Sequence, residues 1–205
     1  MPRVAVLDYG IGNLRSAEKA LQHLGADARL VTDPEVAAQA PAVVLPGVGN
    51  FGRCMEALRA SGLEAVVHDA VESGRPFLGV CVGMQMLFES SEESPGVKGL
   101  SVLPGTVQNL GPGVKLPHMG WNTVLRARPD RLFAGLPDEL WLYFVHSFAP
   151  APADPALTVA TTEYGGTVCA AVARDQLWAT QFHPEKSGAT GMALLANFVR
   201  ACEAG

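Results

Sequence analysis

The first ninety residues alternate short apolar runs with helical patterns, and this alternation constrains the fold more than any other feature. Between the first two runs, apolar residues recur at helical spacing, with Asn13 placed to cap the helix and Gly25 placed to end it. Strands that alternate with helices are typical of a parallel sheet with helical crossovers. Four such runs are expected to be strands: residues 4–8, 28–32, 42–45 and 76–80.

From Gly99 onward the pattern changes to strand-like segments separated by turns. A meander with turns at residues 165–166 and 174–175 is expected to end at Phe182, and a last amphipathic helix should cover one sheet face. The sequence therefore predicts an α/β fold, with an open, mostly parallel sheet, flanking helices and a β-rich second half. Without a linker or a repeat, residues 1–205 are expected to form a single domain. The four strand-like segments are residues 100–110, 121–126, 140–148 and 157–162.

Composition narrows the classes of function. The net charge is −5 and there is no long basic run, so nucleic acid is not expected as a partner. No stretch approaches the roughly 18 apolar residues of a membrane span, and no signal peptide is visible, so no membrane partner and a cytoplasmic location are expected. Four widely spaced cysteines are expected to be free thiols. Neither metal-ligand spacing nor a nucleotide-binding glycine motif is present, so no metal and no cofactor are predicted.

The most specific local signal is the segment Gly79-Val80-Cys81-Val82-Gly83, which follows an apolar strand and leads into a predicted helix. This is a cysteine version of the nucleophile elbow, in which glycines two residues before and after the nucleophile relieve steric crowding. A sulfur at the start of a helix is also favoured as the thiolate. Because most free cysteines are simply small buried side chains, the elbow alone leaves both readings open.

A second motif favours catalysis. His183 follows an apolar strand directly, and Glu185 stands two residues later. A cysteine nucleophile needs a base of this kind and a carboxylate that orients it. His118 and His146 also lie near strand ends, and the sequence does not eliminate them as bases.

Acyl transfer further requires N–H donors for the oxyanion. The segment Gly47-Val48-Gly49 follows the third strand, so Val48 and Gly49 can supply one donor and Val82, at the helix start, the other. A plain turn after a strand is the alternative reading. The glycines would permit a peptide flip that makes or breaks the oxyanion hole, so we expect the isolated chain to be poorly active.

Together these motifs resemble the class I, or triad-type, glutamine amidotransferases. Within that class, the likeness is to the glutaminase subunits of imidazole glycerol phosphate synthases, and it covers nearly the whole chain. Two departures are Val82, where leucine is expected, and Asn50, where a small residue is expected. The segments that carry the likeness are residues 8–13, 83–85, 117–122, 143–147 and 183–187.

The resemblance implies a mechanism. Cys81 attacks the side-chain carbonyl of glutamine, His183 protonates the departing ammonia and then activates water, and Glu185 orients the imidazole. Gln85, one helical turn after Cys81, and Glu93, at the end of the same predicted helix, are expected to contact glutamine. The full set of expected substrate contacts is Gly47, Gln85, Glu93, His146, Ser147 and Phe148.

The resemblance also implies a partner, a (β/α)8-barrel synthase subunit that uses the ammonia to form imidazole glycerol phosphate and an aminoimidazole carboxamide ribotide in histidine biosynthesis. The residues expected at that interface are Asn13, Trp121, Tyr143 and Lys186. Three alternatives remain: a glutaminase serving another synthase, such as that of pyridoxal phosphate, a cysteine peptidase or esterase, and an inactive scaffold.

Overall fold

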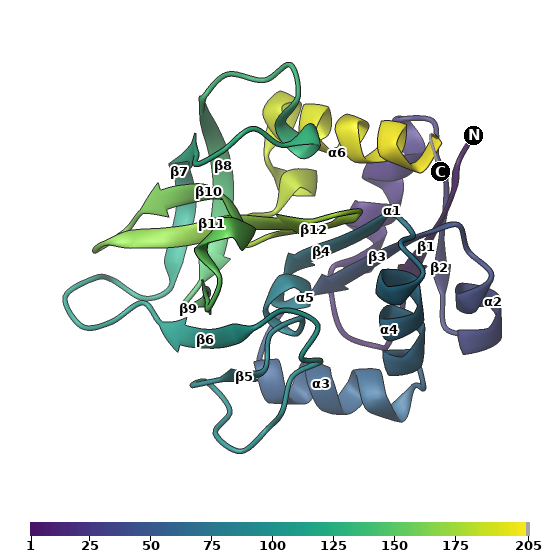
Figure 1. Ribbon diagram of the computed structural model, residues 1–205, viewed down its shortest axis with the longest axis horizontal. Coiled ribbons are helices and arrows are strands. Elements are labelled where there is room, and N and C mark those ends of the chain that lie inside the picture. Colours follow the sequence, from purple (N-terminus) through teal and green to yellow (C-terminus); the bar gives the residue numbers. More distant parts are fainter. Residues whose placement is uncertain (204–205) are drawn as a thin grey trace.

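The computed structural model describes residues 1–203, which form a nine-stranded sheet, a small three-stranded sheet and flanking helices (Figure 1). The strands are β1 (Arg3–Leu7), β2 (Asp27–Val31), β3 (Ala42–Gly47), β4 (Phe77–Cys81), β5 (Ser90–Ser91), β6 (Gly105–Asn109), β7 (His118–Arg126), β8 (Glu139–His146), β9 (Phe148–Pro152), β10 (Thr158–Glu163), β11 (Thr167–Arg174) and β12 (Leu177–Thr180). The helices are α1 (Leu14–His23), α2 (Pro34–Ala38), α3 (Phe51–Ala60), α4 (Glu64–Glu72), α5 (Val82–Gln85) and α6 (Gly188–Glu203), with short 3-10 turns η1 (Arg131–Phe133), η2 (Pro155–Leu157) and η3 (Pro184–Lys186).

The large sheet has the strand order β2-β1-β3-β4-β12-β11-β10-β7-β8. Pairing is parallel from β2 to β12 and antiparallel from β12 to β8. The expected α/β class with flanking helices is confirmed, but the sheet is mixed rather than mostly parallel. The reason is that the β-rich second half joins the same sheet by hairpins instead of forming helical crossovers.

Helices cover both faces of the parallel part. In Figure 1, α1 and α6 lie over one face, and α3 and α4 lie over the other. Strands β3 and β4 are buried along their whole length, and the buried apolar side chains form one continuous cluster. The single domain predicted from chain length stays a prediction, which this continuous core supports.

Helix α1 forms where the sequence predicts it, because Leu14, Ala17 and Leu21 fall on one buried stripe. Gly25 follows it with φ +87, a left-handed conformation that glycine adopts without strain. Asn13 occupies the cap position, but its side chain makes no capping bond to a backbone N–H. Its Oδ1 instead accepts a hydrogen bond of 3.0 Å from the Ser16 hydroxyl.

Several expected elements differ in extent. The strand expected over residues 140–148 is divided between β8 and β9, which belong to different sheets. The helix after Cys81 was expected to reach Glu93, but α5 ends at Gln85. The next three residues, 86–88, are buried like those of α5 itself, so burial does not distinguish them, and a competing backbone pairing ends the helix. Their carbonyl groups accept backbone N–H groups from residues 100–103 instead. That pairing also limits the strand expected over residues 100–110 to β6 (Gly105–Asn109).

In the part of the chain that is described, none of the helices combines the length and the apolar character that crossing a membrane requires.

Candidate active site

The strand β4 ends in a strained turn at Cys81, as the elbow motif predicts. Cys81 has φ 55 and ψ −114, which is rare for a residue with a side chain. Space explains the flanking glycines: a Cβ on Gly83 would lie 1.9 Å from the Leu45 carbonyl oxygen, and one on Gly79 would lie 3.1 Å from the Ala179 Cβ. The close packing of β3, β4 and α5 therefore fixes where the sulfur points.

Strand β12 brings His183 to this sulfur. It pairs in parallel with β4, with Thr180 opposite Val80, so the residues that follow each strand leave at the same sheet edge. The Nδ1 atom of His183 lies 2.8 Å from Glu185 Oε1, and both side chains are almost fully buried. Among the described residues, nothing is hydrogen-bonded to the buried His183 Nε2, which leaves this atom available to sulfur or substrate.

The charge state of His183 follows from its neighbours. Burial lowers the pKa of His183, but the neighbouring Cys81 sulfur and the Glu185 carboxylate more than reverse this and raise the pKa to about 10. The imidazole is therefore held protonated at neutral pH. A cation of this kind beside a cysteine favours the thiolate, which is the nucleophilic form.

The turn that carries His183 is braced by β8. The His183 backbone N–H donates to the Tyr143 carbonyl at 2.9 Å, the Tyr143 N–H donates to the Ser187 hydroxyl at 2.9 Å, and that hydroxyl donates to the His183 carbonyl at 2.6 Å. Trp121 contacts Tyr143 edge-on, with ring centroids 6.2 Å apart. Two of the residues expected at the partner interface thus lie directly beside the catalytic turn.

The other two expected interface residues, Asn13 and Lys186, are exposed. Lys186 belongs to η3, which packs beside α1, and Asn13 precedes that helix.

A cavity of about 140 Å³ joins the residues predicted to act on glutamine. This volume is below the roughly 300–1,000 Å³ of pockets for drug-sized ligands, so it suits a small molecule. Glu185 lies behind His183 and Gly47 lies in β3 opposite Cys81, so neither of them lines the cavity. The lining residues are Val48, Gly49, Cys81, Val82, Gln85, Glu93, Val145, His146, Ser147, Phe148 and His183.

The predicted oxyanion segment is held from behind. The Tyr9 hydroxyl donates to the Pro46 carbonyl at 2.7 Å, and the Cys54 thiol donates to the Val48 carbonyl at 3.4 Å. Burial raises the pKa of Cys54 to about 11, so the sulfur keeps its proton and remains a donor at neutral pH. A Cβ on Gly47 would lie 2.7 Å from the Gly83 nitrogen, which makes this glycine a packing requirement. The substrate contact expected for Gly47 stays a prediction.

Glu93 reaches the cavity from a turn after β5, not from the end of a helix. Its Oε2 accepts a hydrogen bond of 2.7 Å from the Phe51 backbone N–H at the start of α3. Asn50, the departure noted in the sequence, caps the same helix by accepting from the Arg53 N–H at 3.1 Å. Both side chains therefore hold α3 beside the oxyanion segment.

The two competing histidines, His118 and His146, are hydrogen-bonded to each other. His146 Nδ1 lies 2.9 Å from the Phe148 carbonyl oxygen, which can only accept, so this nitrogen carries a proton. His146 Nε2 lies 2.9 Å from His118 Nδ1, and Asn122 Nδ2 lies 3.2 Å from His118 Nε2. Burial lowers the pKa of His146 to about 4 and also lowers the pKa of His118, so both rings are neutral. With both nitrogens used internally, His146 contributes to the cavity wall and not as a base.

One residue in contact with the nucleophile was missed by the sequence analysis. The Gln181 side-chain Nε2 lies 3.7 Å from Cys81 Sγ, and Gln181 Oε1 accepts from Gln85 Nε2 at 3.0 Å. Gln181 directly follows β12 and stands two residues before His183, within the strand that the sequence predicts up to Phe182. That position was the signal that could have identified it, because alternate residues of a strand share one face.

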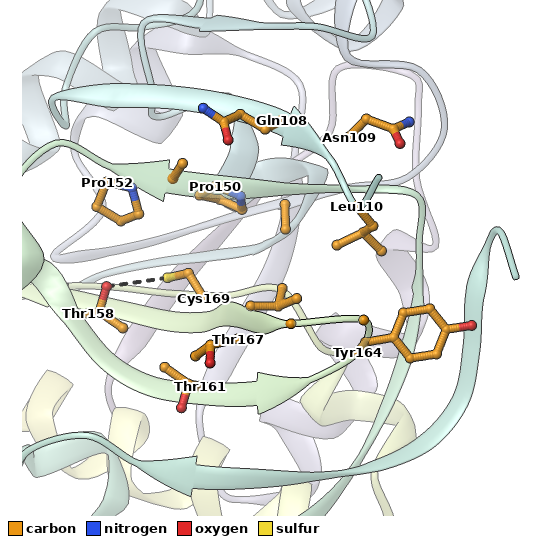
Figure 2. A pocket seen from close by; sticks show the side chains of 15 residues that line it. Gln108, Asn109, Leu110, Pro150, Pro152, Thr158, Thr161, Tyr164, Thr167 and Cys169 are labelled. Carbon is orange, nitrogen blue, oxygen red and sulfur yellow. Dashed lines mark hydrogen bonds between the residues drawn. The ribbon is translucent and has the colours of Figure 1, made fainter. Parts of the chain in front are cut away.

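A larger groove of about 330 Å³ lies elsewhere, between β6 and β9 and the β10–β11 hairpin (Figure 2). Among residues 1–203, no charged side chain and no histidine lines it. Its one sulfur, Cys169, is hydrogen-bonded to the Thr158 hydroxyl over 3.7 Å, and burial raises the pKa of Cys169 to about 11. With no base near this thiol, the smaller cavity at Cys81 is the candidate active site.

Across residues 1–203, no group of three or more His, Cys, Asp or Glu side chains is arranged to hold a metal ion.

The fold and the site define a class I glutamine amidotransferase domain, and the family described as glutamine amidotransferase class-I matches residues 5–202. The imidazole glycerol phosphate synthase subunit HisH of Synechococcus sp. (strain JA-3-3Ab) is 50% identical over 201 residues, covering 96% of this chain and 93% of the relative. The HisH subunit of Syntrophotalea carbinolica is 48% identical over 202 residues, covering 95% and 98%. The chain belongs to this HisH family, as the sequence motifs predict.

A solved structure titled as a glutamine amidotransferase has the same fold, with a TM-score of 0.77 at 23% identity over 98% of both chains.

Proposed function

We propose that the chain hydrolyses glutamine to glutamate and ammonia and delivers the ammonia to a (β/α)8-barrel synthase subunit in histidine biosynthesis. The observation that carries this proposal is the meeting of Cys81 and His183 in one small cavity, with Glu185 bonded to the far side of the imidazole. Nucleophile, proton carrier and orienting carboxylate are the three parts that covalent hydrolysis of an amide needs.

In the first half-reaction, the Cys81 thiolate attacks the side-chain carbonyl carbon of glutamine. Negative charge develops on the carbonyl oxygen, and we assign its stabilisation to backbone N–H groups of Val48 or Gly49 and of Val82, which line the cavity. Protonated His183 gives its proton to the departing nitrogen, which leaves as ammonia. The product is a glutamyl thioester on Cys81.

In the second half-reaction, His183 is neutral and accepts a proton from water as the water attacks the thioester. Glu185, at 2.8 Å, keeps the imidazole oriented and stabilises its positive charge. Glutamate then leaves and the thiolate is restored. The hydrogen bonds of Gln85 Nε2 to Phe148 and Gln181 leave its Oε1 to accept from the substrate, and Glu93 supplies a carboxylate for the α-amino group.

The outer face of β7 and β8 supports the proposal of a protein partner. Met119, Trp121, Leu125 and Trp141 are large apolar side chains that are 44–65% exposed. Alternate strand positions share a face, and the β7–β8 register places these four residues on the same side. Exposed apolar patches of this kind mark interaction surfaces. We assign this patch, with Tyr143 and Lys186, to the barrel subunit.

The relatives are named as subunits of a synthase, which is why a barrel synthase is proposed ahead of another acceptor such as the synthase of pyridoxal phosphate. The small cavity likewise favours a free amino acid over a peptide. Four free cysteines suit the reducing cytoplasm, which is the proposed location.

The test is co-expression of the chain with a barrel synthase subunit, co-purification, and a synthase assay with glutamine as the nitrogen source. We expect a stable complex in which glutamate formation and synthase turnover proceed together. The same complex is given peptide and ester substrates. Hydrolysis of those substrates without hydrolysis of glutamine would overturn the proposal, and glutaminase activity that feeds only a different synthase would overturn the choice of partner.

A further inference from the structure

We propose that Gln181 is a further catalytic residue, whose side-chain N–H donates a hydrogen bond to the Cys81 sulfur and favours the thiolate. Its contribution to turnover rests on the proposed function. The hydrogen bond itself can be tested on the chain alone.

A chain of hydrogen bonds fixes the orientation of the Gln181 amide. The Phe148 carbonyl can only accept, so the Gln85 side-chain atom at 2.9 Å from it must be the nitrogen. The same Gln85 nitrogen also contacts the Gln181 amide at 3.0 Å, so the atom facing it must be the Gln181 oxygen. The Gln181 nitrogen is left pointing at Cys81 Sγ, at 3.7 Å.

The burial of Gln181 makes this contact consequential. The residue is fully buried, and its backbone is held to β11 by a hydrogen bond from Gln181 N to Ala170 O of 2.8 Å. A buried amide does not exchange its partner for water, and electrostatic interactions are stronger away from solvent. On the same sulfur, the Val145 carbonyl lies 4.0 Å away and can accept only from the protonated thiol. The N–H group of Gln181 lies nearer to the sulfur than this carbonyl does, and it favours the thiolate over the protonated thiol.

Other titratable groups also face the sulfur. His183, held by Glu185, approaches from the end of β12, Tyr9 from the end of β1 and Cys54 from α3, while Glu93 lines the cavity. Among these groups, only protonated His183 adds positive charge. His183 loses its proton, and with it its positive charge, when ammonia leaves. The N–H group of Gln181 is present throughout the reaction.

The constant presence of the Gln181 N–H group matters most when the thioester is hydrolysed. Water adds to the thioester carbonyl, its proton passes to His183, and the carbon–sulfur bond breaks with the electron pair going to Cys81. The sulfur leaves as an anion at the moment when His183 is again acquiring its proton. A fixed N–H group stabilises the leaving sulfur without having to reorganise.

The experiment compares Gln181→Met with Gln181→Glu. Methionine keeps the length of the side chain and removes the N–H, while glutamate keeps the oxygen that accepts from Gln85 and places a carboxyl group at the sulfur. Iodoacetamide alkylation of Cys81, followed by peptide mass mapping, is measured against pH. Alkylation requires the thiolate but forms no oxyanion on a substrate carbonyl, so it isolates the effect on the sulfur.

We expect the pH of half-maximal alkylation to rise by about one unit in Gln181→Met, which corresponds to about tenfold slower alkylation below that pH. In Gln181→Glu the rise should be larger, because a negative charge replaces the donor. The matched control is Thr180→Val, which removes a buried hydroxyl on the neighbouring residue, bonded to the Phe182 carbonyl at 3.0 Å, and should leave the profile unchanged.

An unchanged profile in both folded Gln181 variants would overturn the proposal, as would equal shifts in the Thr180→Val control. If neither variant folds, the unsubstituted chain labelled with ¹⁵N at glutamine side chains still decides the matter. Alkylation of Cys81 should shift a slowly exchanging glutamine amide signal, and unshifted signals would contradict the assignment. Absence of glutaminase activity in the complex with a normal alkylation response would reject only the proposed function.

Discussion

The parallel and antiparallel parts of the large sheet contribute differently to the site. Strands β3 and β4 are buried throughout, whereas β7 and β8 leave two tryptophans more than half exposed. The buried part fixes the nucleophile by close backbone packing at Gly83, where no side chain fits. The open part holds the turn of His183 through Tyr143 and Ser187 and presents its outer face to solvent. The candidate catalytic geometry and the proposed partner surface thus meet at one turn.

The largest effect is expected from the nucleophile of the buried part. Cys81→Ala should lower glutamine-dependent turnover of the barrel complex by at least about 10³-fold, because no other thiol of the described residues lines the cavity with the base. Glutamate release measures this loss. Synthase turnover with added ammonium salt is the control and should persist. Retained glutamine-dependent turnover would refute the assignment.

The next effect comes from the residue that orients the base. Glu185→Gln should lower turnover by roughly 10²–10⁴-fold, since an amide can neither stabilise the imidazolium charge nor hold the same tautomer. Steady-state kinetics should show the loss in kcat, with KM for glutamine nearly unchanged. A change confined to KM would mean that Glu185 binds substrate and does not orient His183.

Truncating an exposed apolar side chain should affect binding of the barrel subunit differently in the parallel and antiparallel parts of the molecule. Trp121→Ala should weaken binding of the barrel subunit by about tenfold or more, as expected for a central aromatic anchor. Val36, 55% exposed on the parallel side, provides the matched control, and Val36→Ala should leave the affinity unchanged. Calorimetric titration measures both. Equal effects would show that the patch on β7 and β8 is not the interface.

The smallest effect concerns pH and the paired histidines. The fold lowers the pKa of His146 from 6.5 to about 4, so its contribution to stability is present above pH 6.5 and is lost as pH falls toward 4. The unfolding free energy should drop by about 1 kcal/mol between pH 7 and 5.5 from this group. Denaturant titrations should show that the unfolding free energy of His146→Asn drops less between pH 7 and 5.5. An identical pH dependence in the two proteins would show that His146 is not held neutral.

Local sequence patterns predicted the elbow well. The glycines around Cys81 and the strand before it encode the turn directly, and parallel pairing then brings His183 to the same edge. The length of α5 was wrong, because the residues after Gln85 read as a helix until the competing pairing with residues 100–103 is known. Contacts between residues this far apart in the chain leave no periodic pattern in the sequence.

The same limit explains the residues that were missed. Gln181 meets Cys81 across 100 positions, and Ser187 meets Tyr143 across 44. Neither pair belongs to a short motif, and each depends on which strands become neighbours in the mixed sheet. The turns predicted the meander of β10, β11 and β12, but no local pattern encoded the position of β12 beside β4 or of β7 and β8 at the far edge.

The central claim is that Cys81 forms a covalent bond to the substrate. Acid quenching of the barrel complex during turnover of glutamine, followed by peptide mass mapping, tests this most directly. A glutamyl group on the peptide that contains Cys81 is the predicted result. A complex that releases glutamate while this peptide stays unmodified, or carries the group on another residue, would contradict the account.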